Sequence, residues 1–364
     1  MKLRISQFIN QQLAPVSPVV EAGLQGKTVI IIGANNGIGY EAAKHFALMK
    51  PGKLVLACRS KERGDEALNK LKDKTGCDVA ELWILDLASF DSVKSFAKRF
   101  EKDGGRLDIL VENAGILPDS KCGLTDDGWE PSFQVNHLST SLLALLLLPR
   151  MIQTAVEHHT RPRLVIVSSD VHYWAKISEQ VLTAPEPLKF TAQSRPHYLF
   201  CIRAQNARYS ETKLMNVFFV RALNERLQTT YLIVNAVNPG YCHSHLRAGF
   251  SWYKGWADWA LEKALAHTAE EGSRSLVWAA VGGKEQEDHL RGAYISMAKI
   301  TEASDYVIGE EGRGVQELLW NKLITELSKV DPRVWQVVRK YLTPAKDPKE
   351  ELVSPLTLSY FTNI

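Results

Sequence analysis

Apolar residues in this chain fall into short continuous runs, and the longer segments between the runs carry apolar positions at helical spacing. A run of about five β-branched or aliphatic residues is typical of a strand buried on both faces of a parallel sheet. The runs predict strands at residues 28–32, 54–57, 79–85, 107–111, 163–167, 233–237 and 293–296.

The segments between these strands predict helices. We expect them at residues 40–49, 61–74, 89–102, 129–150, 209–227, 270–281, 314–329 and 332–342, with Asp331 as the cap of the last. Strands that alternate with helices in this way are typical of the α/β class, in which helices cover both faces of a mostly parallel sheet.

The length of 364 residues favours one large α/β domain with additions over two independent domains. We expect that domain at residues 26–330, an N-terminal extension at 1–25, and a C-terminal helix and tail at 331–364. Two long segments interrupt the domain, an irregular insertion at 170–206 and a second segment at 241–265. Long irregular segments over a crevice are usually functional.

The N-terminal extension carries Leu3, Phe8, Ile9 and Leu13, which predict a short amphipathic surface helix. Because the apolar face of this helix is small, we expect the helix to pack on the protein. The alternative is peripheral contact with a membrane surface.

Composition argues against nucleic-acid binding and against a membrane span. The formal net charge is only +3 and the basic residues are mixed with acidic ones, so nothing favours binding to nucleic acid. The most apolar stretch, residues 142–148, is far shorter than the ~20 residues of a membrane span, and we interpret it as part of a buried helix.

The five cysteines are scattered and show neither metal-ligand spacing nor a redox pair, so we expect no metal site. Free thiols are typical of a reducing compartment. Since the first 25 residues also lack the hydrophobic core of a signal peptide, we expect a cytoplasmic protein.

Three glycines, Gly33, Gly37 and Gly39, lie between the first predicted strand and the first helix of the domain. A helix N-terminus offers unpaired N–H groups and partial positive charge to a pyrophosphate, and residues without a Cβ let the phosphates approach. Strand, glycine turn, helix and second strand together predict a dinucleotide site.

The end of the second predicted strand indicates which dinucleotide is bound. Arg59 and Ser60 follow that strand, and no acidic residue stands there to accept hydrogen bonds from a ribose 2′-hydroxyl. An arginine suits a 2′-phosphate, so we predict NADP(H); the alternative is that Arg59 is an ordinary surface residue. Asp86, after the third strand, is expected to contact adenine, to cap the following helix, or to do both.

Further polar and small residues follow the later strands. Asn113-Ala114-Gly115 follows the fourth strand, Ser168-Ser169 the fifth and Pro239-Gly240 the sixth. Carboxyl ends of parallel strands meet at one edge of the sheet, so these residues are expected to share a crevice.

Tyr209 and Lys213 are four residues apart on a predicted helix and therefore lie on one face. A free tyrosine loses its proton near pH ~10, and a nearby ammonium stabilises the phenolate, so the pair suits acid–base catalysis near neutral pH.

In this order and setting, the glycine turn, Asn113-Ala114-Gly115, Asn136, Ser169, the Tyr209–Lys213 pair and Pro239-Gly240 resemble the short-chain dehydrogenase/reductase superfamily. Residues 57–60 and the long segment after Ser169 are most similar to its retinol-dehydrogenase-like branch, which includes fungal relatives similar to the WW-domain oxidoreductase; no WW module is apparent here.

The resemblance implies a Rossmann fold, a doubly wound parallel sheet in a three-layer αβα arrangement. It implies that Tyr209 is the acid/base, that Ser169 binds the substrate oxygen, and that Lys213 bonds the nicotinamide ribose, with Asn136 holding a water that links Lys213 to solvent. The implied cofactor-binding residues are Gly33, Asn35, Asn36, Gly37, Ile38, Gly39, Arg59, Ser60, Asp86, Leu87, Asn113, Ala114, Gly115, Tyr209, Lys213, Pro239, Gly240 and Ser244.

The sequence departs from the family pattern at three positions. Ile32 replaces the usual threonine before the first glycine, Glu112 stands where asparagine is commoner, and Ser244 stands where a threonine binds the cofactor amide. None of these changes removes a catalytic group.

The predicted function is an NADP(H)-dependent oxidoreductase that interconverts a ketone or aldehyde and an alcohol. The two long segments are rich in aromatic residues, including Trp252, Trp256 and Trp259, and favour a lipophilic substrate such as a terpenoid, polyketide or retinoid-like carbonyl. The tryptophans are equally expected as core. The alternative function is an NADP(H)-binding sensor or scaffold without turnover.

Family members commonly pair through the helices that hold Asn136 and Tyr209. The insertion before Tyr209 is expected to obstruct that surface, so both a monomer and a homodimer remain open.

Overall fold

The computed structural model describes residues 2–103, 105–118, 123–193, 202–229, 231–243 and 262–343, and for residues 192–193 and 202–206 it describes the backbone alone. Predictions about Ser244, the three tryptophans and the tail after residue 343 therefore lie outside the described residues.

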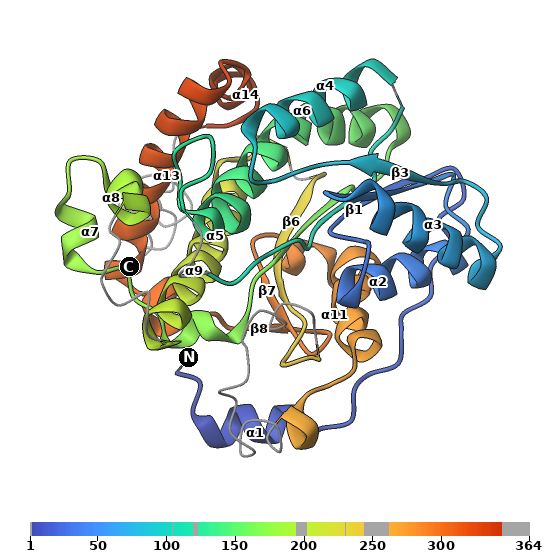
Figure 1. Ribbon diagram of the computed structural model, residues 1–364, viewed down its shortest axis with the longest axis horizontal. Coiled ribbons are helices and arrows are strands. Elements are labelled where there is room, and N and C mark those ends of the chain that lie inside the picture. The colour runs from blue at the N-terminus through green and yellow to red at the C-terminus, as the bar shows by residue number, and fades with distance from the viewer. Residues whose placement is uncertain are drawn as a thin grey trace, which may run out of the picture.

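An eight-stranded sheet forms the centre of the protein, with strand order β3-β2-β1-β4-β5-β6-β7-β8 (Figure 1). Strands β1 to β7 pair in parallel, and only the edge strand β8 is antiparallel. The strands are β1 Thr28–Ile32, β2 Lys53–Cys58, β3 Ala80–Ile84, β4 Ile109–Glu112, β5 Arg163–Val167, β6 Ile233–Asn238, β7 Tyr294–Ser296 and β8 Lys299–Thr301. The α/β doubly wound fold is confirmed.

The strand order reverses between β1 and β4, because the chain runs outward to β3 and then returns to the other side of β1. In an open parallel sheet this reversal leaves a crevice outside the carboxyl ends of the strands, where ligands bind.

Helices cover both faces of the sheet and make three layers (Figure 1). On one face lie α2 (Gly37–Leu48), α3 (Lys61–Thr75) and α11 (Ala269–Val281). On the other face lie α4 (Phe90–Asp103), α6 (Thr140–His158) and α9 (Ile202–Arg226).

Strand β1 shows why the central runs are continuously apolar. Val29 and Ile31 pack into one helical layer, whereas Ile30 and Ile32 pack into the other. All four side chains are at most 1% exposed, as expected for a strand covered on both faces.

The most apolar stretch is buried, as predicted, since Leu142 to Leu148 in α6 are at most 2% exposed. The continuous helical run Pro131–His158, which joins α5 (Pro131–Phe133), a π-helical segment η1 (Gln134–Ser139) and α6, is long and apolar enough to cross a membrane by composition, but 72% of its apolar window lies inside the protein.

The insertion predicted to be irregular at residues 170–206 is largely helical in its described parts, 170–193 and 202–206. The segment contains η2 (Asp170–Trp174), α7 (Glu179–Thr183) and α8 (Pro187–Gln193), and α9 already begins at Ile202. Serine is a favoured N-cap residue because its hydroxyl accepts a hydrogen bond from a backbone N–H of the first turn. Ser169 caps η2 and Ser178 caps α7 in this way. Tyr209 therefore lies inside α9 and not at its start.

The remaining elements follow β6 and complete the described chain. They are η5 (Lys284–Leu290), α12 (Asp305–Ile308), α13 (Glu310–Val330) and α14 (Arg333–Tyr341). The N-cap of α14 is Pro332 and not the predicted Asp331. Asp331 lies one residue earlier, and its carboxylate accepts from the backbone N–H of Arg333, the first residue of the helix, at 2.9 Å. The N-terminal extension forms α1 (Ile5–Leu13), which packs against residues beyond β5 and β6.

Glu112, at the end of β4, is a carboxyl group in the interior of the sheet. Its side chain is 2% exposed, and neither carboxyl oxygen has a hydrogen-bond partner among the described residues. Burial disfavours the charged form and raises the pKa of Glu112 well above its usual value. The folded protein therefore holds this proton at pH values where the unfolded chain has released it.

We predict that Glu112→Gln removes a pH-dependent loss of stability. The folded pKa lies above the unfolded pKa of ~4.3, so stability falls as pH rises through that interval, by up to ~1.4 kcal/mol per pH unit. Urea unfolding from pH 5 to 8 should show the variant gaining stability relative to the parent as pH increases. Parallel curves for the two proteins would contradict this account.

Candidate active site

Two of the predicted glycines, Gly33 after β1 and Gly39 in the first turn of α2, lie in close contact with the end of β4. Gly33 has a φ of 78°, and its N–H donates to the carbonyl of Ala57 at 2.7 Å. A Cβ added at Gly39 would overlap the carbonyl oxygen of Gly33 and the amide nitrogen of Asn113. Only glycine fits at Gly39, and its absence of a side chain brings α2 against the strand ends.

Asn113 ties this turn to β4. Its amide nitrogen donates to the carbonyl oxygens of Ile32 at 3.1 Å and Gly33 at 3.2 Å. A primary amide placed after a strand can reach two neighbouring carbonyls at once, and here it holds β1 and β4 in register at the crevice.

The end of β2 places Arg59 at the surface beside the first turn of α3. Ser60 caps that helix, because its hydroxyl accepts from the N–H of Arg63 at 3.3 Å. The predicted helix cap at Asp86 was wrong: its carboxylate accepts from Ala88, whereas Asp127 accepts from the N–H of Phe90 at the start of α4.

At the end of β5 the two adjacent serines face different ways. Ser168 is 1% exposed and donates to the backbone carbonyl of Lys213 at 2.8 Å, so its hydroxyl is used to hold α9. Ser169 is half-buried, and its hydroxyl accepts from the N–H of Val171 at 3.4 Å. Of the two, Ser169 is the serine left to face a ligand.

Lys213 is brought to the same place from α9. Its Nζ lies 5.5 Å from the ring centroid of Tyr209 and donates to the carbonyl of Val167 at 2.9 Å. The side chain is buried, and the lost hydration lowers the pKa of Lys213 to about 8. An ammonium has three donors, and Val167 is the one hydrogen-bond partner of Nζ within the described part of the chain.

Asn136 lies in the π-helical segment η1 and links the segment after β4 to α9. Its amide exchanges two hydrogen bonds with the backbone of Ile116, at 2.8 and 2.9 Å, and donates to the hydroxyl of Thr212 at 3.2 Å. Single-turn π segments are frequent at functional sites because they shift the side chains that follow. The predicted water-holding role of Asn136 stays a prediction.

Two residues near Ser169 were missed by the sequence analysis. His172 donates from Nδ1 to the carbonyl of Ser169 at 2.8 Å and accepts at Nε2 from the N–H of Ser304 at 3.3 Å, an arrangement that requires the neutral ring. Burial accordingly lowers the pKa of His172 to about 4. No sequence signal marked this residue, since it lies in a segment interpreted as an irregular loop.

Asp170, next to Ser169, was missed for the same reason. Its carboxylate is buried and accepts from the hydroxyl of Tyr294 at 2.8 Å. Burial raises the pKa of Asp170 to about 6. Together with His172, it fixes the backbone around the serine.

The turn after β6 carries Pro239 and Gly240, the latter with a φ of 84°. The amide oxygen of Asn238 accepts from the N–H of Gly240 at 3.1 Å, and its amide nitrogen donates to the hydroxyl of Ser296 at 3.1 Å. This turn therefore lies beside β7, at the same edge of the sheet as the other predicted residues.

The glycine turn leaves room for the phosphates of a dinucleotide. Apart from its chain neighbours and the nearby backbone of α2, no described atom lies within 4 Å of a Cβ built at Gly37, at the start of α2, so the turn leaves room there for a phosphate. A Cβ at Gly115 would stand 3.3 Å from the amide oxygen of Asn136 and 3.5 Å from Nζ of Lys213, which places this glycine at the same crevice.

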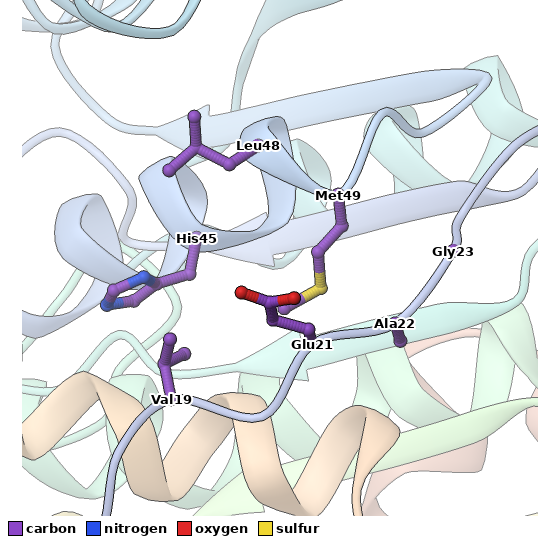
Figure 2. A pocket seen from close by; sticks show the side chains of 7 residues that line it. All are labelled: Val19, Glu21, Ala22, Gly23, His45, Leu48 and Met49. Atoms are coloured by element: carbon purple, nitrogen blue, oxygen red, sulfur yellow. The ribbon is translucent and has the colours of Figure 1, made fainter.

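A separate surface pocket of 470 Å³ lies between the N-terminal extension and α2 (Figure 2). It is lined by Val19, Glu21, Ala22, Gly23, His45, Leu48 and Met49. None of these seven is a predicted site residue, so the pocket is not part of the candidate active site.

We predict that Gly39→Ala destabilises the protein and impairs NADPH binding. The added methyl group overlaps the turn and forces α2 away from β4, at a cost of ~1–3 kcal/mol. Gly314→Ala is the matched control, because this exposed helical glycine has open space around it and alanine should stabilise α13 by ~0.5–1 kcal/mol. Thermal unfolding and NADPH fluorescence titration measure both effects; equal behaviour of the two variants would refute the packing argument.

The short chain dehydrogenase family model matches residues 27–177. A short chain dehydrogenase/reductase from Cryptosporiopsis, dmxR8, is 36% identical over 338 residues, covering 90% of this chain and 98% of the relative. The short-chain dehydrogenase anuD of Penicillium roqueforti is 34% identical, covering 90% of this chain and 84% of that protein.

Solved structures agree with the fold. A short chain dehydrogenase from Salmonella enterica is 22% identical with a TM-score of 0.55, covering 75% of this chain and 96% of its own. A short chain dehydrogenase from Shigella flexneri, crystallised with NADP, is also 22% identical with a TM-score of 0.55. The match covers 76% of this chain and 98% of that protein. On the full-length similarity to its curated relatives, this chain belongs to the short-chain dehydrogenase/reductase superfamily of oxidoreductases.

Proposed function

We propose that this oxidoreductase uses NADP(H) to interconvert a ketone or aldehyde and an alcohol on a lipophilic small molecule. The observation that carries the proposal is the position of Lys213, whose buried ammonium lies 5.5 Å from the Tyr209 ring centroid at the end of β5.

The roles of the side chains follow from this arrangement. Bound NADPH supplies the hydride. Tyr209 gives its hydroxyl proton to the carbonyl oxygen, and the Lys213 ammonium stabilises the phenolate that results. Ser169 donates to the same oxygen and stabilises the negative charge that develops there. In the oxidising direction, Tyr209 takes the proton from the alcohol.

Lys213 also has donors to offer a ribose hydroxyl, because Val167 accepts only one of its three N–H groups among the described contacts. Asn136 supports this lysine indirectly, through Thr212, the residue before it in α9.

The choice of NADP(H) rests on Arg59. This exposed arginine follows β2, and no acid stands at that strand end to bind a free 2′-hydroxyl. The NADP complex of the Shigella flexneri protein with the same fold supports the choice.

The lipophilic substrate is supported by aromatic residues beyond the strand ends. Trp174, in η2 after Ser169, is 51% exposed, and Phe8 lies between it and Tyr241, which follows Gly240. Trp174, Phe8 and Tyr241 thus form an aromatic group beyond the ends of β5 and β6, which supports an apolar ligand.

We predict that Tyr209→Phe strongly slows carbonyl reduction while NADPH still binds. Loss of the acid should lower kcat by ~10²–10⁴-fold, because general acid catalysis contributes that much. NADPH oxidation over a panel of hydrophobic aldehydes and ketones, with fluorescence titration of NADPH, measures both properties. Unchanged turnover in the variant would contradict the proposal, and binding without turnover in the parent, in both reaction directions, would favour a sensor or scaffold.

We predict that Arg59→Ala lowers affinity for NADPH but leaves NADH binding unchanged. A charge-assisted contact to the 2′-phosphate contributes ~1.5–3 kcal/mol, which corresponds to roughly 10–150-fold in the NADPH dissociation constant. Titrations of each protein with NADPH and with NADH separate the contribution of the 2′-phosphate contact from any general effect on cofactor binding. An equal effect on both cofactors would assign Arg59 to the surface or to the fold.

A further inference from the structure

Gln12 is a buried polar residue on the otherwise surface-exposed helix α1. Its side chain is 5% exposed, and its amide nitrogen donates to the carbonyls of Tyr241 and Leu265, each at 3.0 Å. Its amide oxygen accepts from the N–H of Tyr241 at 3.2 Å. The backbone carbonyl of Gln12 also accepts from Nε2 of His267 at 2.9 Å.

These partners lie on both sides of residues 244–261 in the sequence. Tyr241 follows the Pro239–Gly240 turn, and it pairs with the returning chain through the N–H of His267, which donates to the Tyr241 carbonyl at 2.9 Å. The amide oxygen of Gln12 also comes within 3.1 Å of a Cβ built at Gly240. Gln12 therefore acts on the turn where the nicotinamide is expected.

Leu3, just before α1, and Phe8, within it, contact the segment that follows β5. The indole N–H of Trp174 donates to the carbonyl of Leu3 at 3.0 Å. The ring of Phe8 makes edge contacts with Trp174, at 6.0 Å between centroids, and with Tyr241, at 6.4 Å. The helix thus joins the segments after β5 and β6, the two strands that carry Ser169 and Gly240.

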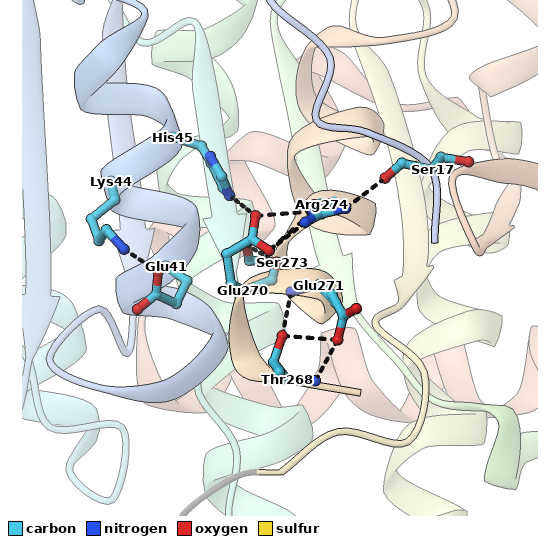
Figure 3. Close-up of polar contacts among 9 residues, drawn as sticks. All are labelled: Ser17, Glu41, Lys44, His45, Thr268, Glu270, Glu271, Ser273 and Arg274. Carbon is cyan, nitrogen blue, oxygen red and sulfur yellow. Dashed lines mark hydrogen bonds and ion pairs between the residues drawn. The ribbon is translucent and has the colours of Figure 1, made fainter. Parts of the chain in front are cut away.

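A second attachment holds the chain after α1 (Figure 3). Arg274 of α11 donates to the carbonyl of Ser17 at 3.3 Å, and it forms an ion pair with Glu270 at 2.6 Å. Glu270 also lies 3.0 Å from Nε2 of His45 in α2, so the extension is attached to the layer that carries the glycine turn.

We propose that Gln12 is a positioning residue of the active site, and that α1 is part of the cofactor and substrate side of the crevice. A primary amide donates and accepts at once, so Gln12 pairs with the N–H and the carbonyl of Tyr241 as a neighbouring strand would. This proposal deepens the proposed function and rests on it, because it assumes that the Gly240 turn binds the nicotinamide.

The test compares Gln12→Met with Gln11→Met in the full chain. Methionine keeps the length of glutamine and removes both polar atoms, while Gln11, its neighbour on α1, has only a backbone bond among the contacts described. Gln12→Asn is the second variant, since its amide is one methylene too short to reach both carbonyls and it retains the polarity of the site.

Backbone hydrogen exchange in peptides 239–243 and 262–268 and fluorescence titration with NADPH are the readouts. We expect Gln12→Met and Gln12→Asn to speed exchange in both peptides and to weaken NADPH binding by about three- to tenfold, corresponding to one or two lost hydrogen bonds. Gln11→Met should match the parent.

Exchange and NADPH affinity equal to those of Gln11→Met would overturn the positioning role. A loss of thermal stability without a change in NADPH affinity would also overturn it, because it assigns Gln12 to the fold alone. The exchange arm needs neither cofactor nor substrate, so failure of the proposed function, seen as a parent protein that does not bind NADPH, remains distinguishable from failure of this inference.

Discussion

The close approach of the β1–α2 turn to the end of β4 is the contact on which the rest of the site depends. A Cβ at Gly39 would overlap both Gly33 and Asn113, and the Asn113 amide bonds the carbonyls of Ile32 and Gly33. This contact sets the N-terminus of α2 over the crevice between β1 and β4. Because the later strands pair outward from β4, their carboxyl ends meet the same opening.

Burial of Lys213 disfavours the charged ammonium that the proposed mechanism needs beside Tyr209. Removing its ammonium from water lowers its pKa to about 8, and Val167 is the one described acceptor of its N–H groups. A charge held this way is unfavourable unless other oxygens complete its environment. The phenolate of Tyr209 and the hydroxyls of a bound ribose would provide that environment, so the cost of burying Lys213 prepares the site for its ligand.

Local pattern was enough to predict the strands β1 to β7 of the sheet. The continuous runs predicted β1 and β5 to the residue, because strands buried on both faces leave little choice of side chain. The short β8 was missed because three residues, Lys299–Thr301, carry no periodic signal. The helices after Ser169 were missed because prolines and aromatic residues there are equally typical of loops.

Site residues could be predicted when their own side-chain chemistry marks them. They could not be predicted when their role depends on a hydrogen-bond partner far away in the sequence. Tyr209, Lys213 and Ser169 were named from spacing, strand ends and family resemblance. His172 and Gln12 were not, since their roles depend on Ser304 and Tyr241, far away in the sequence, and nothing local marks such contacts.

The central claim is hydride transfer from NADPH to a carbonyl carbon at the crevice beside Ser169 and Tyr209. The most direct measurement is incubation with NADPH deuterated at the nicotinamide C4, separately on each face, followed by mass spectrometry of the alcohol formed from a lipophilic ketone. The account predicts one deuterium on the carbinol carbon from one of the two labelled cofactors and none from the other. An alcohol product without deuterium from either labelled cofactor would contradict it.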